Sequence, residues 1–293
     1  MTTFGIIANY RKTELWEILP PLVQWLLDKG QQVALTDRLV GSRYQAPKEV
    51  KIYSTAVIVK HADIMLSIGG DGTLLSSARI IGKADVPILG IHMGGLGFLA
   101  EVPVAGTYTA LEKVLAGDYQ LDERMVLAVD LQAAGKVQTY YAINDLVVAR
   151  GASPRLLKAR VEVSNRKLNE YVADGLIVAT PTGSTAYSLA AGGPIVVPTL
   201  EALTITPISP HSLSARPIVV PSTDRVVIRF AEQEEKIALI LDGQVMIDID
   251  SKAVVTARRA RWNIKLVRLA DWDYYQVLRT KMGWSGDTGG RNG

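Results

Sequence analysis

The spacing of apolar residues changes near residue 122, and this change predicts two domains of different architecture. Before it, short apolar runs alternate with helix-like segments, as in a doubly wound, mostly parallel sheet built from βαβ units. After it, apolar and polar residues alternate, which is typical of strands with one buried face. The length of 293 residues also suits two domains. We expect an α/β domain over 1–121, a β-rich domain over 122–269 and a flexible, glycine-rich tail over 285–293.

The first domain is predicted to contain four buried strands and two helices. The strands are expected at 4–8, 32–35, 64–68 and 86–91, and the helices at 14–29 and 73–81. Pro20 and Pro21 lie in the middle of the first helix, so we expect a kink or a break there, because proline cannot donate the helical hydrogen bond.

The second domain is predicted to be mostly strands. They are expected at 125–131, 140–149, 156–164, 171–179, 226–230, 236–241 and 253–269, with one helix starting near Thr185. Asp174-Gly175 and Asp242-Gly243, each flanked by apolar residues, indicate hairpin turns.

The composition excludes several kinds of site. The chain has no cysteine, which rules out disulfides, zinc-thiolate sites and cysteine nucleophiles. Its three histidines are far apart in the sequence, so a histidine-rich metal site is excluded as well. The net charge of +3 is too small to indicate a nucleic-acid or membrane partner, and no apolar run is long enough to span a membrane. With no secretion signal, a cytoplasmic protein is expected.

A glycine-rich loop that carries an acid follows the strand expected at 64–68. In Gly69-Gly70-Asp71-Gly72-Thr73, the glycine and threonine backbone N–H groups at the start of a helix are suited to hold a donor phosphate. Asp71 would repel that phosphate unless a divalent cation intervenes or the carboxylate acts on a neighbouring hydroxyl. This combination indicates phosphoryl transfer. The alternative is a simple turn in which Asp71 caps a helix from Thr73.

A second strand-loop-helix segment spans 180–194 and is rich in hydroxyls. Its uncharged side chains suit ribose, amide and phosphate oxygens, and Tyr187 offers an aromatic face to a base. The alternative is an ordinary capped helix, with Ser184 or Thr185 as the N-cap and Gly192-Gly193-Pro194 as its end. The segment lacks the Gly-x-Ser-x-Gly pattern of a nucleophile elbow, since Ala186 follows Thr185.

Two further acids are candidate binding residues. Asn144-Asp145 interrupts an apolar strand, which favours a binding role over simple solvation. Asp174 precedes Gly175 and is also explained by a hairpin turn alone.

Four segments occur in an order that resembles one enzyme family. They are the loop at 69–73, Gly-x-Leu-Gly-Phe at 94–98, the hydroxyl-rich stretch at 180–194 and the turn at 241–244. Together they resemble the NAD kinases, which phosphorylate NAD to NADP with ATP or polyphosphate. Lipid kinases and phosphofructokinases have similar glycine loops, but the stretch at 180–194 is specific. The family usually has Asn-Glu where this chain has Asn144-Asp145, so the carboxylate here is one methylene shorter.

The resemblance implies an active site in a cleft between the two domains, with residues 270–284 packing back on the first domain. It implies Mg²⁺ or another divalent cation, ATP or polyphosphate as the donor, and a homodimer or homotetramer. Asp71 is the implied catalytic residue. The implied NAD contacts are Asp71, Gly72, Asn144, Asp145, Asp174, Thr185, Ala186, Tyr187, Ser188, Leu189, Ala190 and Gln244.

The hypothesis from these residues is that Asp71 accepts the proton of the 2′-hydroxyl of the adenosine ribose while that oxygen attacks the donor's γ-phosphorus. Two alternatives stay open. A lipid kinase could use the same glycine loop, although no basic amphipathic helix for membrane docking is evident. A non-catalytic NAD(P) sensor could use both loops, although a carboxylate beside a pyrophosphate would weaken its binding.

Overall fold

The computed structural model describes residues 1–41, 43–151, 155–232 and 236–284 and divides the chain into two compact units. Unit 1 contains residues 1–123 and the chain from Lys265 onward, and unit 2 contains residues 124–264. The expected flexible tail, 285–293, lies outside the described residues. Within the described part, no helix is both long and apolar enough to span a membrane.

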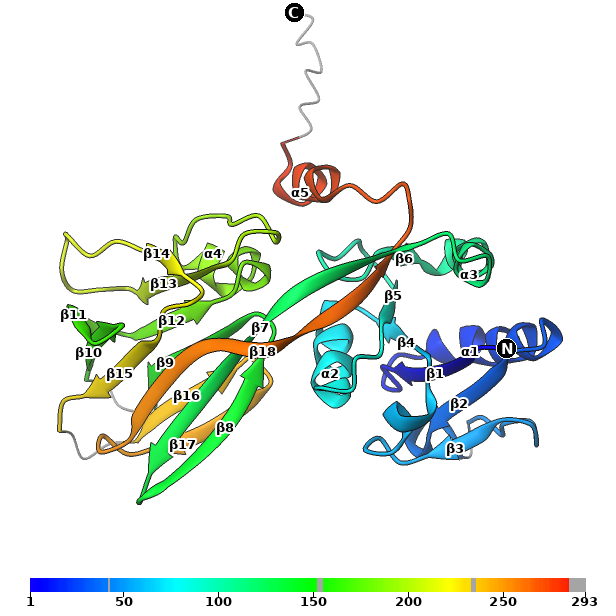
Figure 1. Ribbon diagram of the computed structural model, residues 1–293, viewed down its shortest axis with the longest axis horizontal. Coiled ribbons are helices and arrows are strands. Elements are labelled where there is room, and N and C mark those ends of the chain that lie inside the picture. Colours follow the sequence, from blue (N-terminus) through cyan, green and yellow to red (C-terminus); the bar gives the residue numbers. More distant parts are fainter. Residues whose placement is uncertain (42, 152–154, 233–235, 285–293) are drawn as a thin grey trace, which may run out of the picture. The chain divides into compact units, whose positions relative to one another are not determined.

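Unit 1 is built on a parallel sheet, as predicted (Figure 1). Its strands are β1 (Thr3–Ala8), β2 (Gln32–Thr36), β3 (Lys51–Tyr53), β4 (Ile64–Gly69), β5 (Ile88–His92) and β6 (Val102–Pro103). The order is β3-β2-β1-β4-β5, and β6 pairs with β5 in parallel. The end of the long strand β18 (Val254–Arg268) also pairs with β5, through Leu266 and Ile88. The carboxyl ends of the parallel strands therefore share one edge, where ligands of open α/β sheets bind.

Unit 1 contains four helices in its described part, and three of them, α1, α2 and α3, cover the two faces of this sheet. The helices are α1 (Leu15–Asp28), α2 (Asp71–Ile81), α3 (Thr107–Leu115) and α5 (Tyr274–Met282), with short 3₁₀ turns η1 (Asp37–Leu39), η2 (Ile58–His61) and η3 (Val104–Gly106). Helices α1 and α3 share a core with Phe4 and Ile6, whose side chains point to one face. Helix α2 covers the other face, where Ser77 Oγ donates to Ser67 Oγ at 2.9 Å. The doubly wound arrangement is confirmed.

Two details of the helices differ from the sequence predictions. Pro20 and Pro21 do not split the first helix, because α1 runs unbroken from Leu15 to Asp28. Five side chains of its apolar stripe, Leu15, Leu19, Leu22, Val23 and Leu26, are buried, and this packing stabilises the helix beyond what its hydrogen bonds alone provide. Helix α3 was not expected at all, because its four buried positions are mixed with tyrosine, threonine and charged residues.

Unit 2 consists of two antiparallel sheets that share one core, which confirms the predicted β-rich domain. The strands are β7 (Gln120–Ala133), β8 (Lys136–Ala142), β9 (Asp145–Arg150), β10 (Leu157–Val163), β11 (Arg166–Ala173), β12 (Gly175–Ala179), β13 (Ala202–Ile208), β14 (Ile218–Pro221), β15 (Val226–Phe230), β16 (Ile237–Leu241), β17 (Val245–Ile249) and most of β18. One sheet has the order β14-β13-β12-β9-β16-β17, and the other joins β11-β10-β15-β18 with β7 and β8.

The two predicted hairpins have different outcomes. Asp242-Gly243 does join a hairpin, β16–β17, and both residues have positive φ, 50° and 62°, as a type I′ turn requires. Asp174-Gly175 does not, because β11 pairs with β10 in one sheet while β12 pairs with β9 and β13 in the other. The segments expected as single strands at 140–149 and 171–179 are therefore each two strands.

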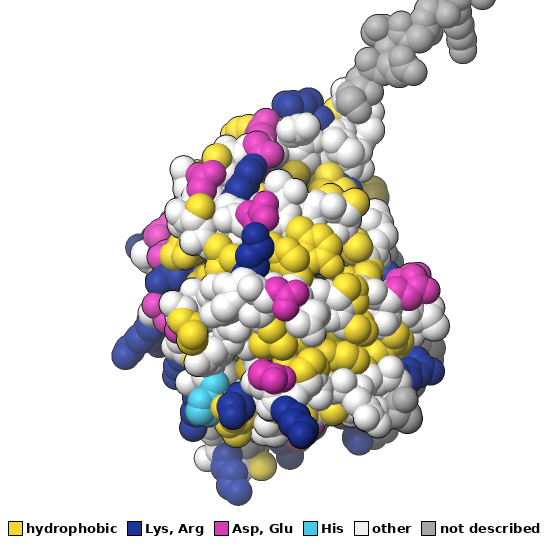
Figure 2. Space-filling view, turned by 90° about the vertical axis from the view of Figure 1, so that its right-hand side faces the viewer, with side chains coloured by type: hydrophobic (Ala, Val, Ile, Leu, Met, Phe, Trp, Pro, Cys, Tyr) yellow, Lys and Arg dark blue, Asp and Glu magenta, His cyan; other side chains and the backbone are white. Residues whose placement is uncertain are grey.

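The surface carries mixed charge on the face shown in Figure 2. Acidic and basic side chains are interspersed there, with apolar side chains between them. This face has no extended patch of one sign.

Candidate active site

The glycine loop lies where β4 ends and α2 begins, as the sequence predicts. Gly69 is the last residue of β4, and α2 starts at Asp71, two residues before the predicted start. A side chain at position 69 would collide with the side chain of Thr73, so this close approach requires glycine. The first turn of α2 therefore directs backbone N–H groups to the ligand-binding edge of the sheet.

The Asp71 carboxylate binds a second loop instead of capping its own helix. Its Oδ2 accepts a hydrogen bond from Phe98 N at 2.8 Å, and its Oδ1 accepts bonds from Leu99 N and Ala100 N at 3.1 Å each. A side chain at Gly97 would collide with this carboxylate, so glycine is required there too. The alternative of a simple helix cap is therefore excluded, since α2 has no side-chain cap bond. The structure instead joins the segments at 69–73 and 94–98.

Arg268 holds the same loop from the other side. Its Nη1 donates to Leu99 O at 2.9 Å, and its Nε donates to Asp122 Oδ2 at 3.1 Å. Its guanidinium also pairs with Glu101 at 3.4 Å and stacks over Trp272 at 4.2 Å from the ring centroid. Burial raises the pKa of Glu101, and the nearby Arg268 opposes that shift. Nothing in the local sequence marks Arg268, because its hydrogen-bond and ion-pair partners, Leu99, Glu101 and Asp122, are distant along the chain.

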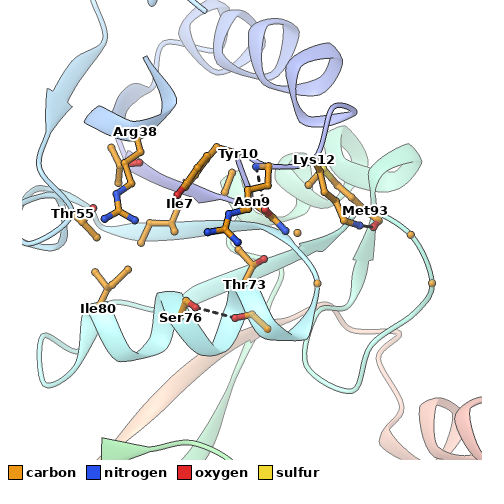
Figure 3. Close-up of a pocket in the computed structure, with 18 residues that line it drawn as sticks. Ile7, Asn9, Tyr10, Lys12, Arg38, Thr55, Thr73, Ser76, Ile80 and Met93 are labelled. Carbon is orange, nitrogen blue, oxygen red and sulfur yellow. Dashed lines mark hydrogen bonds between the residues drawn. The ribbon is translucent and has the colours of Figure 1, made fainter. Parts of the chain in front are cut away.

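A cavity of about 660 Å³ opens beside the glycine loop, within unit 1 (Figure 3). Its lining includes Gly69, Gly70, Gly72 and Thr73 together with residues that follow β1 and β2. Three of the lining side chains are cationic, and none of the described lining residues is acidic: the cations are Arg11, Lys12 and Arg38. This volume lies within the range of about 300–1,000 Å³ that is typical of small-molecule sites. No sequence pattern predicts these cations, which follow strand ends but belong to no recognised motif.

In unit 2, three predicted segments meet at one edge of the antiparallel sheet. The Asp242 carboxylate accepts hydrogen bonds from Ile143 N at 2.9 Å and Asn144 N at 2.8 Å. Thr180 N donates to Asn144 O at 2.8 Å, and Thr180 Oγ1 donates to Ile143 O at 2.6 Å. A side chain at Gly183 would collide with the Asn144 backbone. The Asn144-Asp145 turn is thus held by the 180–183 loop on one side and by Asp242 on the other.

Asp145 has an unusual environment at this edge. It is 3% exposed, and Asp242 beside it is 8% exposed. Burial, and after it the negative charge of Asp242, raise the pKa of Asp145 from 3.8 to about 7. Asp145 is therefore substantially protonated near neutral pH and can donate a hydrogen bond as well as accept one.

Most hydroxyls of the 180–194 segment are not available to a ligand. Thr180, Thr182, Ser184 and Ser188 are buried, because a packed loop must pair its own polar groups. Their partners are Ile143 O for Thr180, Arg124 for Thr182, Pro181 O and Val196 N for Ser184, and Thr206 for Ser188. Neither Ser184 nor Thr185 caps a helix, since the N-cap of α4 (Tyr187–Ala190) is Ala186 and has no side-chain bond. The predicted cap is wrong.

The remaining predicted NAD contacts fall in two places. Thr185 and Ala186 are partly exposed and lead into the single turn of α4, where Tyr187 is 48% exposed. Gln244 follows the Asp242-Gly243 turn at the same edge as Asn144. Asp174 lies at the opposite end of β12, where it pairs with Arg150 at 2.7 Å. Five residues of strand, about 17 Å, separate it from the other predicted contacts of unit 2.

Both parts of the chain are similar to known proteins. The ATP-NAD kinase N-terminal domain matches residues 4–119, and the ATP-NAD kinase C-terminal domain matches residues 143–269. The NAD kinase of Geobacter sulfurreducens is 39% identical, with 97% of this chain and 99% of that protein covered. The NAD kinase of Koribacter versatilis is 41% identical with the same coverage.

The chain belongs to the NAD kinase family. It is accordingly a kinase, a phosphotransferase that acts on a hydroxyl group. Solved structures in the NAD kinase family share its fold. Yeast NADH kinase complexed with NADH gives a TM-score of 0.90 at 24% identity, covering 98% of this chain and 88% of that one. An NAD kinase from Archaeoglobus fulgidus in complex with ATP gives 0.73 at 22% identity, covering 96% and 97%.

The described side chains of this NAD kinase family chain do not form a set of metal ligands around one point. Among the described residues, no three histidine or acidic side chains lie close enough together to bind a metal ion. The one acid of the glycine loop, Asp71, already accepts three backbone hydrogen bonds. A resident metal held by the chain itself does not fit this site.

Proposed function

We propose that this kinase transfers the γ-phosphoryl group of ATP to the 2′-hydroxyl of the adenosine ribose of NAD. The observation that carries the proposal is a glycine loop with one acid, Asp71, beside a cationic cavity in a chain of the NAD kinase family. The cationic lining suits a triphosphate, because three positive side chains offset its charge. The named relatives, NAD kinases about 40% identical over nearly the whole chain, support NAD as the acceptor.

Asp71 is the proposed general base. A carboxylate has about four acceptor positions, and three are occupied by the amides of Phe98, Leu99 and Ala100. The remaining position is the one we assign to the 2′-hydroxyl. Asp71 takes the hydroxyl proton as the O–P bond to the γ-phosphorus forms and the bond to the β-phosphate oxygen breaks. General-base catalysis of this kind contributes about 10²–10⁴-fold to a rate.

The second group of proposed contacts comes from unit 2. Asn144 and Asp145 are fixed by the hydrogen bonds of their own turn, so they are preorganised to bind ribose hydroxyls. When protonated, the carboxyl of Asp145 adds a hydrogen-bond donor to this turn. Gly72, Thr185, Ala186, Tyr187 and Gln244 complete the proposed set.

Four of the contacts that the resemblance implies are placed differently from this set. Ser188 is buried and bonded to Thr206, so its proposed contact is through the backbone, as for Leu189 and Ala190. Asp174 is paired with Arg150 at the other end of β12 and is left out of the proposal.

A divalent cation is proposed to enter with the donor. Mg²⁺ commonly binds through substrate phosphates and one or two carboxylates, which suits a site with no protein cage. A homodimer or homotetramer and a cytoplasmic location stay predictions. Sedimentation of the purified protein would measure its oligomeric state.

A direct assay tests the proposal. The protein is incubated with NAD, ATP and MgCl₂, and NADP is measured with an NADP-specific dehydrogenase. We expect NADP to form with ATP and to require the divalent cation, so that EDTA abolishes it. Parallel reactions with polyphosphate as donor and with NADH as acceptor define the range of substrates. Binding of NAD without any NADP, under conditions where a known NAD kinase is active, would contradict the proposal and favour a sensor.

A further inference from the structure

The cavity of unit 1 has two chemically different ends. At one end, the loop after β1 lies beside the glycine loop, since Asn9 N donates to Ile68 O at 2.9 Å and Met93 N donates to Gly69 O at 2.7 Å. Lys12 is fixed there, because its Nζ donates to Met93 O at 2.5 Å. Backbone N–H groups and cations therefore meet at this end, which suits phosphate.

The other end is formed by Arg38, Thr55, Ile7 and Ile80, which Figure 3 shows on the side away from Lys12 and Met93. Ile80 stands nine residues after Asp71 on α2, about 13 Å along the helix axis. This end combines two apolar side chains, a hydroxyl and a guanidinium. The Arg38 side chain is exposed and has no hydrogen-bond or ion-pair partner among the described residues.

The two ends match the two parts of a nucleotide. A triphosphate fits the end beside Lys12 and the glycine loop, whereas a planar base fits against apolar side chains and a guanidinium, which stacks well on aromatic rings. An inorganic phosphate chain has no apolar part and would gain nothing from Ile7 and Ile80. The composition of the far end therefore favours a nucleoside over further phosphates.

We propose that Arg38, Thr55 and Ile80 bind the nucleoside of the phosphoryl donor and so select a nucleoside triphosphate over inorganic polyphosphate. This inference rests on the proposed function, since it assigns the cavity to the donor of that reaction. Arg38 supplies stacking and polar contact to the base, and Thr55 supplies a hydroxyl at the same end.

Binding measurements on Arg38→Ala test the inference without NAD. Isothermal titration calorimetry with the non-hydrolysable ATP analogue AMP-PNP and with inorganic triphosphate, each with Mg²⁺, separates the nucleoside from the phosphates. We expect Arg38→Ala to weaken AMP-PNP binding about tenfold, the scale of one stacked cation. Binding of inorganic triphosphate should stay within about twofold of wild type. Thr55→Val is a second variant, expected to show the same pattern to a smaller degree.

The control is Lys60→Ala, which removes one exposed positive charge from the same unit, at a residue that does not line the cavity. It should leave both affinities unchanged. The inference is overturned if Arg38→Ala binds AMP-PNP as tightly as wild type, or if it loses inorganic triphosphate as strongly as AMP-PNP. Triphosphate binding too weak to detect in wild type would itself support a need for the nucleoside. Failure of the proposed function is seen separately, as absence of NADP in the wild-type assay.

Discussion

Replacing Asp71 with asparagine separates two possible roles of this side chain. Asparagine has nearly the same shape but cannot accept a proton at neutral pH. Its one carbonyl oxygen can still accept two of the three amide bonds, from Leu99 and Ala100, but its NH₂ group faces the N–H of Phe98. The substitution therefore removes the proposed base and also one of the three bonds that hold the second loop.

The sizes of these two effects differ. Losing one hydrogen bond to a charged group costs about 1.5–3 kcal/mol, which would appear mainly as lower stability. Losing a general base lowers turnover about 10²–10⁴-fold. We expect Asp71→Asn to reduce kcat at least about 10²-fold and to change the Kd for NAD only a few-fold.

The measurements are steady-state formation of NADP, titration calorimetry with NAD and thermal unfolding. Gly97→Ala is the matched control, because its methyl group would collide with the Asp71 carboxylate and displace the loop while the carboxylate itself is retained. We expect Gly97→Ala to lose stability but to keep much more turnover than Asp71→Asn.

Two results would refute this reasoning. Turnover of Asp71→Asn within about tenfold of wild type would remove Asp71 as the base. An equal loss in Gly97→Ala and Asp71→Asn would assign the effect to the position of the loop and not to proton transfer.

Three further predictions concern the supporting residues. Asp145→Asn should raise the melting temperature more at pH 8 than at pH 5. The folded-state pKa of about 7 lies above the ordinary 3.8, so ionisation of Asp145 destabilises the wild-type fold as pH rises through this interval. An equal gain in melting temperature at both pH values would contradict the raised pKa. Arg268→Ala leaves the carboxylate of Glu101 without its buried partner and should lower the free energy of unfolding by about 3–5 kcal/mol in urea titrations. A change below about 1 kcal/mol would show that Arg268 does not stabilise the loop that contains Leu99 and Glu101. Gly183→Ala forces a methyl group against the Asn144 backbone. We therefore expect the free energy of unfolding to fall by about 1–3 kcal/mol and NAD binding, measured by calorimetry, to weaken. Wild-type values for both would show that the turn accommodates the methyl group.

The glycine loop shows what can and cannot be predicted from neighbouring residues. Strand, glycines and helix are all properties of neighbouring residues, so their order and the placement of Asp71 at the strand end were predicted correctly. The hydrogen-bond partners of Asp71 were not, because Phe98, Leu99 and Ala100 lie 27–29 residues away along the chain. Local spacing left a helix cap open as the alternative, whereas the actual partners are three backbone donors of a distant loop.

The hydroxyl-rich segment shows the opposite error. Its composition suggested a polar surface for a ligand, but Ser184 and Ser188 are completely buried. A buried hydroxyl needs a hydrogen-bond partner within the protein. Here the partners are Val196 for Ser184 and Thr206 for Ser188, and no pattern in the segment identifies them.

The sequence alone determined the two architectures and the family, because apolar periodicity and the order of the motifs are properties of the linear sequence. It could not determine which strands share a sheet, and the two Asp-Gly pairs demonstrate this. Asp242-Gly243 closes a hairpin, whereas Asp174-Gly175 joins strands of different sheets, although the dipeptide is the same. Only the tertiary structure decided between them, because the partners of a strand are chosen by packing and hydrogen bonds with residues far away in the chain.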